Sequence, residues 1–337
     1  MNAKPRVAVL ISPDRCYENI NERFSHMVGD RLDLVMQESP TPSDADIAAL
    51  IQDADAMVTG WGTPTIAPEI IVQAKRLRLV VHAQGSVKPL PYEAILNQGI
   101  ILTNSARAYA RTMGEAVIGM MLALGYHMRY SHELYTYQQS TSFDRSEILG
   151  IGLDGKTVGI VGLGPIGSLI AEMLPTFNVS LVAYDPYVDP VIARQRNVTL
   201  VDSIDALAQQ CQILTVHCGW TEETTGLVSR GVLEQLGPRN MLICNARMPI
   251  VDEDALYERV VAQQIYAALN LLPMRKDLWL NPELRGLPNL LLTHGSSNVS
   301  DTWYDQVSRN VAVQLLNFFD GKSVSPQLTL EQIAGST

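Results

Sequence analysis

TVGIVGLGPIGSLIAEML, residues 157–174, has the pattern of a buried strand, a glycine turn and a helix. Gly162, Gly164 and Gly167 stand at the spacing G-x-G-x-x-G. At this spacing the first glycine permits a tight turn, the second lets the backbone approach a pyrophosphate, and the third lets the helix pack on the strand. The helix N-terminus then offers free N–H groups and the positive end of its dipole to the phosphates. The stretch therefore predicts a dinucleotide site.

The next apolar run, VSLVAYD at 179–185, ends in Asp185. An acid at the end of the second strand can accept hydrogen bonds from the ribose hydroxyls of NAD, and it repels the additional phosphate of NADP. The residues that follow, PYVDP, contain no Arg or Lys to receive such a phosphate. We therefore predict NAD as the cofactor.

Short apolar runs alternate with helical patterns along the whole chain, which is typical of parallel sheets covered by helices. Strands are expected at 6–12, 32–37, 56–60, 77–83 and 100–104, and again at 157–164, 179–185, 198–202, 212–218, 240–246, 265–272 and 289–294. This pattern predicts an α/β protein with two Rossmann-like, doubly wound parallel-sheet domains.

Two helical segments connect the two series of strands. Residues 111–140 are apolar almost all round, so we expect one long helix that is buried between domains or against a second subunit. The last helical pattern, 301–321, is expected to pack back on the first series of strands. We therefore assign 1–104 and 300–337 to one domain and 105–299 to the dinucleotide-binding domain.

Composition excludes several classes of protein. Among 337 residues, 25 are Lys or Arg and 35 are Asp or Glu, and the net charge of −10 argues against nucleic acid or an anionic membrane as a partner. No apolar run approaches the ~20 residues of a membrane span, and the N-terminus is expected to be a strand rather than a signal peptide. Cys16, Cys211, Cys218 and Cys244 have no CxxC spacing, which favours reduced thiols in a cytoplasmic protein. No His/Cys/Asp cluster has the spacing of a metal site.

Five segments, in order along almost the whole chain, resemble the D-isomer-specific 2-hydroxyacid dehydrogenases. LDGKTVGIVGLGPIG resembles the start of that family's cofactor domain, and VHCGWTEETTGLV resembles its HxPxTxxTxGL stretch. LICNARMPIVDEDAL resembles its LINTARGxxVDExAL stretch and keeps Arg247. QGSVKPL resembles the glycine loop that meets the substrate carboxylate, and GEAVIGMMLALGYHMR resembles its AExxxxLxLxxxR helix.

The resemblance implies a flavodoxin-like substrate domain with an inserted NAD-binding domain, and a homodimer paired through the helix around 113–125. It implies hydride exchange between nicotinamide C4 and C2 of a 2-hydroxy or 2-keto acid, with an Arg that grips the carboxylate, a His that moves the proton and a Glu that holds the His. Arg247 takes the Arg role. The implied substrate loop is Gly85, Ser86, Val87 and Lys88, and the implied cofactor residues besides the three glycines and Asp185 are Pro165, Ile166, His217, Cys218, Thr224, Cys244, Ala246 and Asn270.

The chain departs from the family pattern where the proton relay should be. The family's AAxDVFxxEP corresponds to AALNLLPMRK, so its Asp becomes Asn270 and its Glu becomes Arg275. The positive charge of Arg275 would favour a substrate with a second negative group. The family's NVxLTPHxxG corresponds to NLLLTHGSS, so without gaps Gly295 takes the His position and His294 the Pro position. Ser300 as helix N-cap and Gly321 as the glycine that ends the last helix support this ungapped correspondence.

Two functions remain open. The first is an NAD-dependent oxidoreductase that acts on a small 2-hydroxy or 2-keto acid or a related anion, with an altered relay whose proton comes from His294, Lys88 or a water. The second is an NAD(H)-binding regulator, scaffold or non-redox enzyme without dehydrogenase turnover. The sequence does not identify the substrate.

Overall fold

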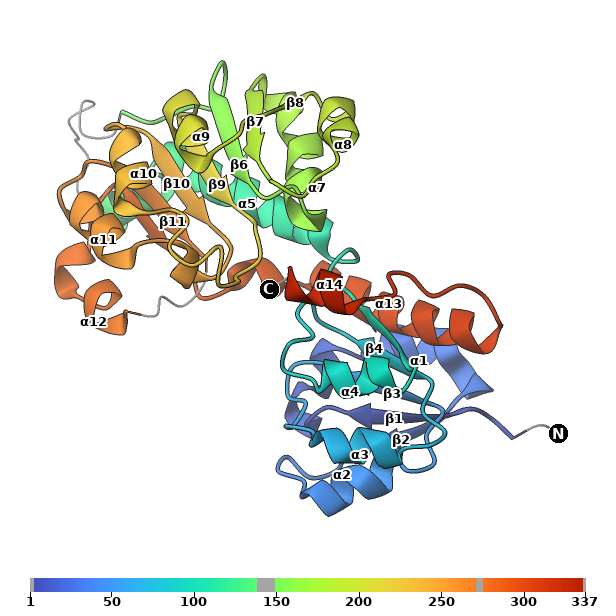
Figure 1. The fold of residues 1–337 in the computed structure, drawn as a ribbon. Coiled ribbons are helices and arrows are strands. Elements are labelled where there is room, and N and C mark those ends of the chain that lie inside the picture. The colour runs from blue at the N-terminus through green and yellow to red at the C-terminus, as the bar shows by residue number, and fades with distance from the viewer. Residues whose placement is uncertain (1–2, 138–148, 271–274, 336–337) are drawn as a thin grey trace. The chain divides into compact units, whose positions relative to one another are not determined.

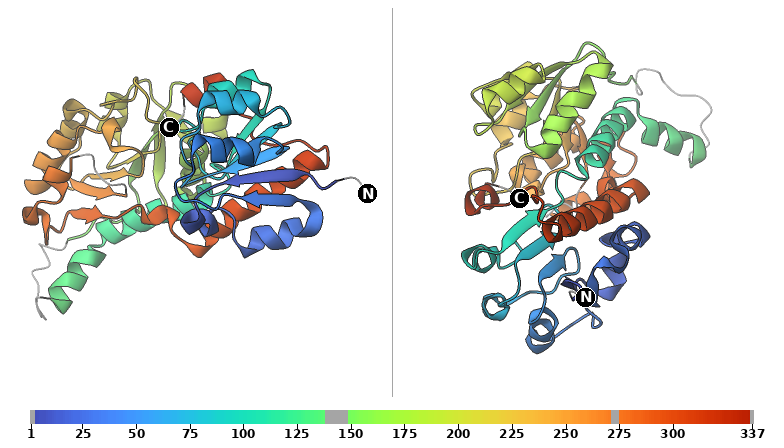
Figure 2. Two further views of the ribbon diagram at one scale, coloured as in Figure 1. Left: turned by 90° about the horizontal axis from the view of Figure 1, so that it is seen from below. Right: turned by 90° about the vertical axis from the view of Figure 1, so that its right-hand side faces the viewer.

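The computed structural model describes residues 3–137, 149–270 and 275–335, and the chain divides into two compact units (Figure 1). Unit 1 comprises Met1–Tyr109 and Val299–Thr337, and unit 2 comprises Ala110–Asn298. Each unit has one parallel sheet with helices on its faces (Figure 2), so the expected α/β class with two parallel sheets is confirmed.

The sheet of unit 1 has the order β2-β1-β3-β4-β5, which is the flavodoxin-like order that the resemblance implied. All its neighbouring strands are parallel. The strands are β1 (Arg6–Leu10), β2 (Asp33–Met36), β3 (Ala56–Thr59), β4 (Leu79–His82) and β5 (Ile101–Asn104). The helices are η1 (Pro13–Glu18), α1 (Glu22–Val28), η2 (Gly29–Arg31), α2 (Asp44–Ile51), α3 (Pro68–Gln73), α4 (Tyr92–Asn97), α13 (Asp301–Phe319) and α14 (Leu330–Ala334).

Alternate residues of each strand supply the two cores of unit 1, because successive side chains of a strand point to opposite faces. Val7 and Val9 of β1 join a core with α1 and α13, whereas Ala8 and Leu10 join a core with α2, α3, α4 and α14. Strands buried on both faces read as continuous apolar runs, which explains the pattern of the sequence.

The sheet of unit 2 has the order β12-β11-β10-β9-β6-β7-β8, and its neighbouring strands are also parallel. The order reverses between β6 and β9, and ligands of such sheets bind outside the carboxyl ends of the strands at this reversal. The strands are β6 (Thr157–Val161), β7 (Ser180–Tyr184), β8 (Val198–Leu200), β9 (Ile213–Val216), β10 (Met241–Cys244), β11 (Tyr266–Leu269) and β12 (Leu290–Leu292).

Helices again cover both faces of this sheet. One core contains residues of α5, α7 and α8, and the other contains residues of α9, α10, α11 and α12. The helices are α5 (Ala110–Gly125), α6 (Met128–Thr136), α7 (Pro165–Met173), η3 (Leu174–Phe177), α8 (Pro190–Gln195), α9 (Ile204–Gln210), α10 (Arg230–Gln235), η4 (Met248–Ile250), α11 (Glu253–Val261), α12 (Lys276–Trp279), η5 (Pro282–Leu284) and η6 (Ser296–Asn298).

The single long helix expected at 111–140 is wrong, since the structure has two helices there, α5 and α6; residues 138–140 lie outside the described part. His127 stands between them with φ 50°, and a residue in this left-handed conformation ends a right-handed helix. Its buried ring bonds the carbonyl of Pro288 at 3.1 Å. The apolar residues of α5 are covered within unit 2, where α5 packs against α7, β10 and β11.

The return helix α13 has the N-cap and the following glycine that the sequence predicted. The Ser300 hydroxyl accepts the N–H of Trp303 at 3.1 Å as the N-cap, and Gly321 follows the helix with φ 69°. Within the described residues, no helix is long and apolar enough to span a membrane.

Candidate functional site

The glycine turn after β6 has the geometry of a phosphate cradle. Gly162 has φ 89°, and a Cβ on it would lie 2.7 Å from the backbone N of Cys218. A Cβ on Gly167 would lie 2.0 Å from the carbonyl O of Gly162, so α7 can approach the turn only with glycine there. A Cβ on Gly164 would meet no atom within 4 Å, because this glycine borders open space at the start of α7. Pro165 is the first residue of α7 and, with Ile166, flanks this opening.

Asp185 follows β7 and holds the glycine turn in place. One carboxylate oxygen, Oδ2, accepts the N–H of Leu163 at 2.7 Å, and Oδ1 accepts the N–H groups of Tyr187 at 2.9 Å and Val188 at 3.1 Å. A carboxylate offers about four acceptor positions, so Oδ2 retains one for a ribose hydroxyl. The same residue thus shapes the turn and keeps an acceptor beside it.

We expect NAD to bind more tightly than NADP, and Asp185→Ala to narrow this preference about tenfold to hundredfold, because a charged hydrogen-bond partner contributes about 1.5–3 kcal/mol. Asp189→Ala is the matched control, because this variant removes the same charge from a nearby aspartate that caps α8. Fluorescence titrations with NADH and NADPH measure both effects. Equal affinities for the two nucleotides in the unmodified protein would refute the assignment.

The loop after β9 contains neutral groups. Burial lowers the pKa of His217 to about 3, and its Nε2 lies 2.7 Å from the Thr215 hydroxyl. Burial also raises the pKa of the Cys218 thiol to about 11. Thr224 shapes the loop, because its hydroxyl donates to the carbonyl of Gly219 at 2.7 Å. The first side chains after β9, those of His217 and Cys218, are therefore uncharged.

A network of amides and hydroxyls joins the carboxyl ends of β10, β11 and β12. The Nδ2 of Asn270 donates to Asn245 Oδ1 at 2.5 Å and to the Ser297 hydroxyl. Its Oδ1 accepts the Thr293 hydroxyl at 2.7 Å and the Ser296 hydroxyl at 3.4 Å. Sequence reasoning selected Asn270 and missed Asn245, although an amide directly after a buried strand was the available signal.

Arg247 lies three residues beyond β10, after Cys244 and Ala246. Burial raises the pKa of the Cys244 thiol to about 12, and this thiol donates to the Ala246 carbonyl at 3.7 Å. The Arg247 side chain is exposed, and among the described residues it has no ion pair or hydrogen bond. It is therefore a cation available to an anionic ligand at the edge of the sheet that carries the glycine turn.

His294 lacks the support that a proton relay needs. Its side chain is exposed, and within the described ranges it has no hydrogen bond and no carboxylate partner. The next residue, Gly295, has φ 66° and donates its N–H to the carbonyl of Asn270 at 2.6 Å. A non-glycine residue would be strained in this conformation, so the loop is built around glycine.

Arg275 is already neutralised by two aspartates. Its Nη1 donates to both carboxylate oxygens of Asp254 at 2.8 and 3.0 Å, and its Nε and Nη2 form a bidentate pair with Asp277 at 3.0 and 2.7 Å. These partners raise the pKa of Arg275. The buried Glu253 carboxylate accepts the Arg275 N–H and the indole N–H of Trp279. Because its charge is already paired, Arg275 is not assigned to substrate binding.

The predicted substrate loop of unit 1 follows β4. The carbonyl of Gly85 accepts the Asn104 amide at 2.6 Å, and a Cβ on Gly85 would lie 2.4 Å from the Tyr109 hydroxyl. Burial lowers the pKa of His82 to about 4, while its ring bonds the Thr59 hydroxyl and the backbone of Ser86. The following Val87 is buried and Lys88 is exposed. The loop is thus fixed in shape at the carboxyl edge of its sheet.

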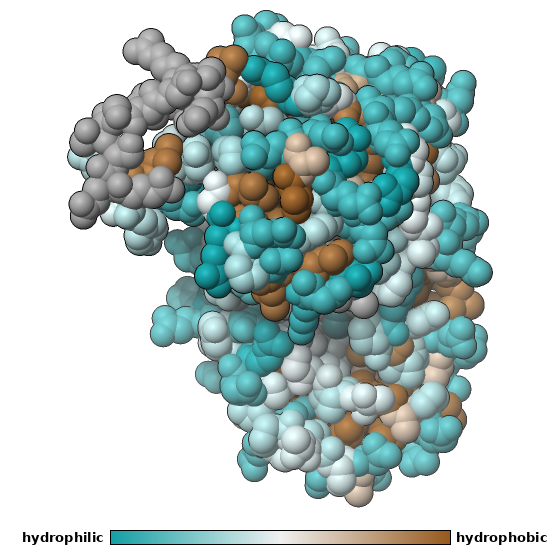
Figure 3. Space-filling view, turned by 90° about the vertical axis from the view of Figure 1, so that its left-hand side faces the viewer, coloured by the Kyte–Doolittle hydropathy of each residue, from teal (hydrophilic) through white to brown (hydrophobic). Residues whose placement is uncertain are grey.

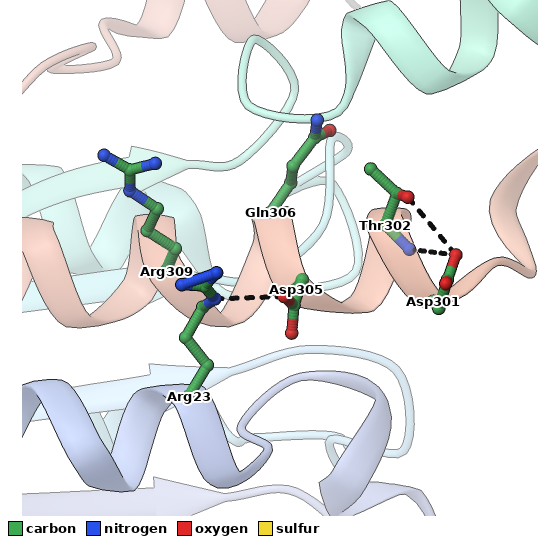
Figure 4. Close-up of a pocket in the computed structure, with 6 residues that line it drawn as sticks. All are labelled: Arg23, Asp301, Thr302, Asp305, Gln306 and Arg309. Carbon is green, nitrogen blue, oxygen red and sulfur yellow. Dashed lines mark hydrogen bonds and ion pairs between the residues drawn. The ribbon is translucent and has the colours of Figure 1, made fainter.

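A pocket on unit 1, shown in Figure 4, is a separate feature. It is lined by Arg23, Asp301, Thr302, Asp305, Gln306 and Arg309. It contains two arginines and two aspartates; Arg23 pairs with Asp305 at 3.0 Å, and Asp301 lies beside Thr302 (Figure 4). Because these charges balance, the pocket offers no strong anchor for a charged ligand, and we assign it no function. In the described part of the chain, no three His, Cys, Asp or Glu side chains are grouped to hold a metal ion.

Comparisons with known proteins agree with this geometry. Residues 118–294 match the model of the D-isomer specific 2-hydroxyacid dehydrogenase NAD binding domain. D-3-phosphoglycerate dehydrogenase of Methanocaldococcus jannaschii is 31% identical over 218 residues, which cover 65% of this chain and 41% of that protein. The rat enzyme of the same name is 27% identical over 87% of this chain and 54% of its own length. The chain thus spans about half the length of the curated relatives it matches.

Solved structures show the same fold. D-mandelate dehydrogenase of Rhodotorula graminis has a TM-score of 0.82 at 18% identity and covers 97% of this chain, with 98% of its own length aligned. An NAD+-bound 3-phosphoglycerate dehydrogenase of Entamoeba histolytica has a TM-score of 0.71 at 20% identity, over 97% of this chain and 99% of that one.

Proposed function

Because the chain belongs to the D-isomer specific 2-hydroxyacid dehydrogenase family, we propose that it is an NAD-dependent oxidoreductase with an altered proton relay. Its substrate is a small 2-hydroxy or 2-keto acid or a related anion. The cofactor of this family, NAD, supplies or accepts the hydride when bound. The cradle at Gly162, Gly164 and Gly167 and the open acceptor on Asp185 fit the pyrophosphate and ribose of NAD.

The observation that carries this proposal is the unpaired Arg247 guanidinium at the carboxyl edge of the unit 2 sheet. A guanidinium binds a carboxylate through two parallel hydrogen bonds, which orients a 2-keto acid as well as attracting it. In the described residues nothing competes for it. Within unit 1, the loop of Gly85, Ser86, Val87 and Lys88 is a separate candidate for substrate binding, as the family resemblance implied.

The proton relay differs from the Arg–Glu–His scheme of the family. In the ungapped correspondence His294 is one residue away from the family's His position, and in the described part of the chain it has no carboxylate partner. We therefore assign the proton to His294 acting unassisted, to Lys88 or to water. The alternative, an NAD(H)-binding protein without turnover, is favoured by the same observation, since a site without a relay can still hold the nucleotide.

An absorbance assay separates the two functions. Purified full-length protein with NADH is offered a panel of small 2-keto acids, beside a titration of NADH by fluorescence. Saturable NADH binding with oxidation by at least one 2-keto acid is expected. Binding without any oxidation would refute the oxidoreductase and support the alternative, and absence of both would refute the cofactor site.

We also propose a homodimer, whose interface includes α6 because the apolar residues of α5 are covered within unit 2. Figure 2 shows α6 projecting from unit 2, and it has no buried residue. Its Met128 is 55% exposed and its Tyr135 is 70% exposed. On the face of the molecule in Figure 3, hydrophobic residues form separate patches among hydrophilic ones. An exposed helix with apolar side chains of this size is typical of a surface that a second subunit covers.

Light scattering at micromolar concentration should give twice the 37.1 kDa of one chain. Tyr135→Glu should shift the mass toward the monomer, because a charge in an apolar interface loses its hydration without a partner. Val72→Glu, on an exposed apolar position of α3, is the control. A monomeric unmodified protein would rule out the dimer.

The four cysteines are free thiols in the structure. They support the further proposal that the protein works in a reducing compartment such as the cytoplasm, where thiols do not pair.

A further inference from the structure

The order of strands in unit 2 places the two halves of a bound dinucleotide. Asp185 at the end of β7 marks the adenosine side, and the glycine turn after β6 marks the pyrophosphate. Since the nucleotide crosses the point where strand order reverses, its nicotinamide half lies toward the ends of β9, β10 and β11. The amide network of Asn245 and Asn270 occupies two of those strand ends.

Asn270 has no hydrogen-bonding capacity left for a ligand. Its two Nδ2 hydrogens go to Asn245 and Ser297, and the two acceptor positions of its Oδ1 receive the hydroxyls of Thr293 and Ser296. A primary amide has two donors and two acceptor positions, and all four are used. Asn270 therefore serves to hold its neighbours.

Asn245 differs from Asn270 in that one of its side-chain atoms, Nδ2, is not hydrogen-bonded to any described residue. Its Oδ1 accepts hydrogen bonds from Asn270 at 2.5 Å and from the Ser297 hydroxyl at 3.2 Å, which fixes the side chain. Its Nδ2 is buried and has no hydrogen-bond partner among the residues that the structure describes, and the residue as a whole is only 9% exposed. Buried donors without a partner are rare in folded proteins, and such a group in a site calls for an acceptor from a ligand.

We propose that Asn245 Nδ2 donates a hydrogen bond to the carboxamide oxygen of bound nicotinamide. This inference rests on the NAD site of the proposed function. The carboxamide is the only amide of NAD, and its oxygen is an acceptor that both NAD+ and NADH present in the same form. The network around Asn245 consists of amides and hydroxyls, so it orients the carboxamide through dipoles and binds both oxidation states.

Titrations with the full chain test this role. Asn245→Ala should weaken NADH and NAD+ about tenfold each, the loss that corresponds to one hydrogen bond at a desolvated site. The affinity for ADP-ribose, which lacks nicotinamide, should change less than about twofold on the same scale. Asn240→Ala is the matched control and should leave all three affinities unchanged. Asn240 precedes β10, at the end of that strand opposite to Asn245, and its side-chain amide donates to the Cys211 carbonyl.

A nucleotide analogue in which one atom of the carboxamide is replaced completes the test. Thionicotinamide adenine dinucleotide replaces the carboxamide oxygen by sulfur, a weaker acceptor, so the unmodified protein should bind it several times more weakly than NAD+. That difference should disappear in Asn245→Ala. Its persistence there, or an equal loss of ADP-ribose and NADH affinity in the variant, would overturn the assignment of Asn245. An unmodified chain that binds neither ADP-ribose nor NADH would instead overturn the cofactor site on which the proposal rests.

Discussion

Arg247→Ala is expected to weaken binding of a 2-keto acid about tenfold to hundredfold, because loss of a charged hydrogen-bond partner costs about 1.5–3 kcal/mol or more. The guanidinium is exposed, and it has no partner among the described residues that would be set free by the change. The substitution should therefore leave the melting temperature and NADH affinity near those of the unmodified protein. KM and kcat for the best 2-keto acid, measured beside an NADH titration, give the result.

Arg247→Lys separates charge from geometry. A lysine keeps the positive charge but loses the planar pair of donors, so it should recover only part of the lost affinity. Full recovery would show that charge alone suffices at this position. An unchanged KM in Arg247→Ala would contradict the proposed substrate site itself.

His294→Ala is the informative comparison. Removal of a working acid–base group typically lowers the rate ~10²–10⁴-fold. We expect a smaller effect, since the His294 side chain is exposed and has no carboxylate partner among the described residues. A loss beyond a thousandfold with Arg247 intact would restore the ordinary relay, and activity that survives the change would point to Lys88 or water.

The fold followed from two features of the sequence. Continuous apolar runs such as residues 77–83 predict strands buried on both faces, and their alternation with helical patterns leaves few arrangements other than a parallel sheet. The break at His127 could not be predicted in this way. It depends on a left-handed backbone stabilised by a contact with Pro288, which lies far along the chain, and the apolar pattern continues through it.

The site was predictable only where a residue acts through its own chemistry. Gly162 and Asp185 have meaning at their spacing alone, because backbone conformation and charge decide their roles. Arg275 and Asn245 depend on partners that no motif specifies. Two aspartates pair with Arg275. Asn270 donates to the Oδ1 of Asn245, whose Nδ2 has no hydrogen-bond partner among the described residues. Hydrogen bonds between strand ends form only after the sheet is assembled.

Gly167→Ala and Gly164→Ala are expected to have opposite effects on stability and the same effect on the cofactor. A Cβ on Gly167 would lie 2.0 Å from the carbonyl O of Gly162, which is backbone and cannot rotate away. Overpacking of this kind costs about 1–3 kcal/mol, and more where the neighbour is fixed. Gly167→Ala should thus lower the melting temperature and weaken NADH binding, because α7 moves away from the turn.

Gly164→Ala should leave the fold intact while abolishing most NADH affinity. Gly164 has φ −65°, which alanine adopts freely, and a Cβ there meets no protein atom within 4 Å. Substitution of glycine by alanine at a compatible position stabilises by ~0.4–1 kcal/mol through the unfolded chain. The added methyl group would instead occupy the space through which a pyrophosphate approaches the N-terminus of α7. Thermal melting and NADH fluorescence on both variants separate the two effects, and normal NADH affinity in Gly164→Ala would show that the phosphates do not bind at this turn.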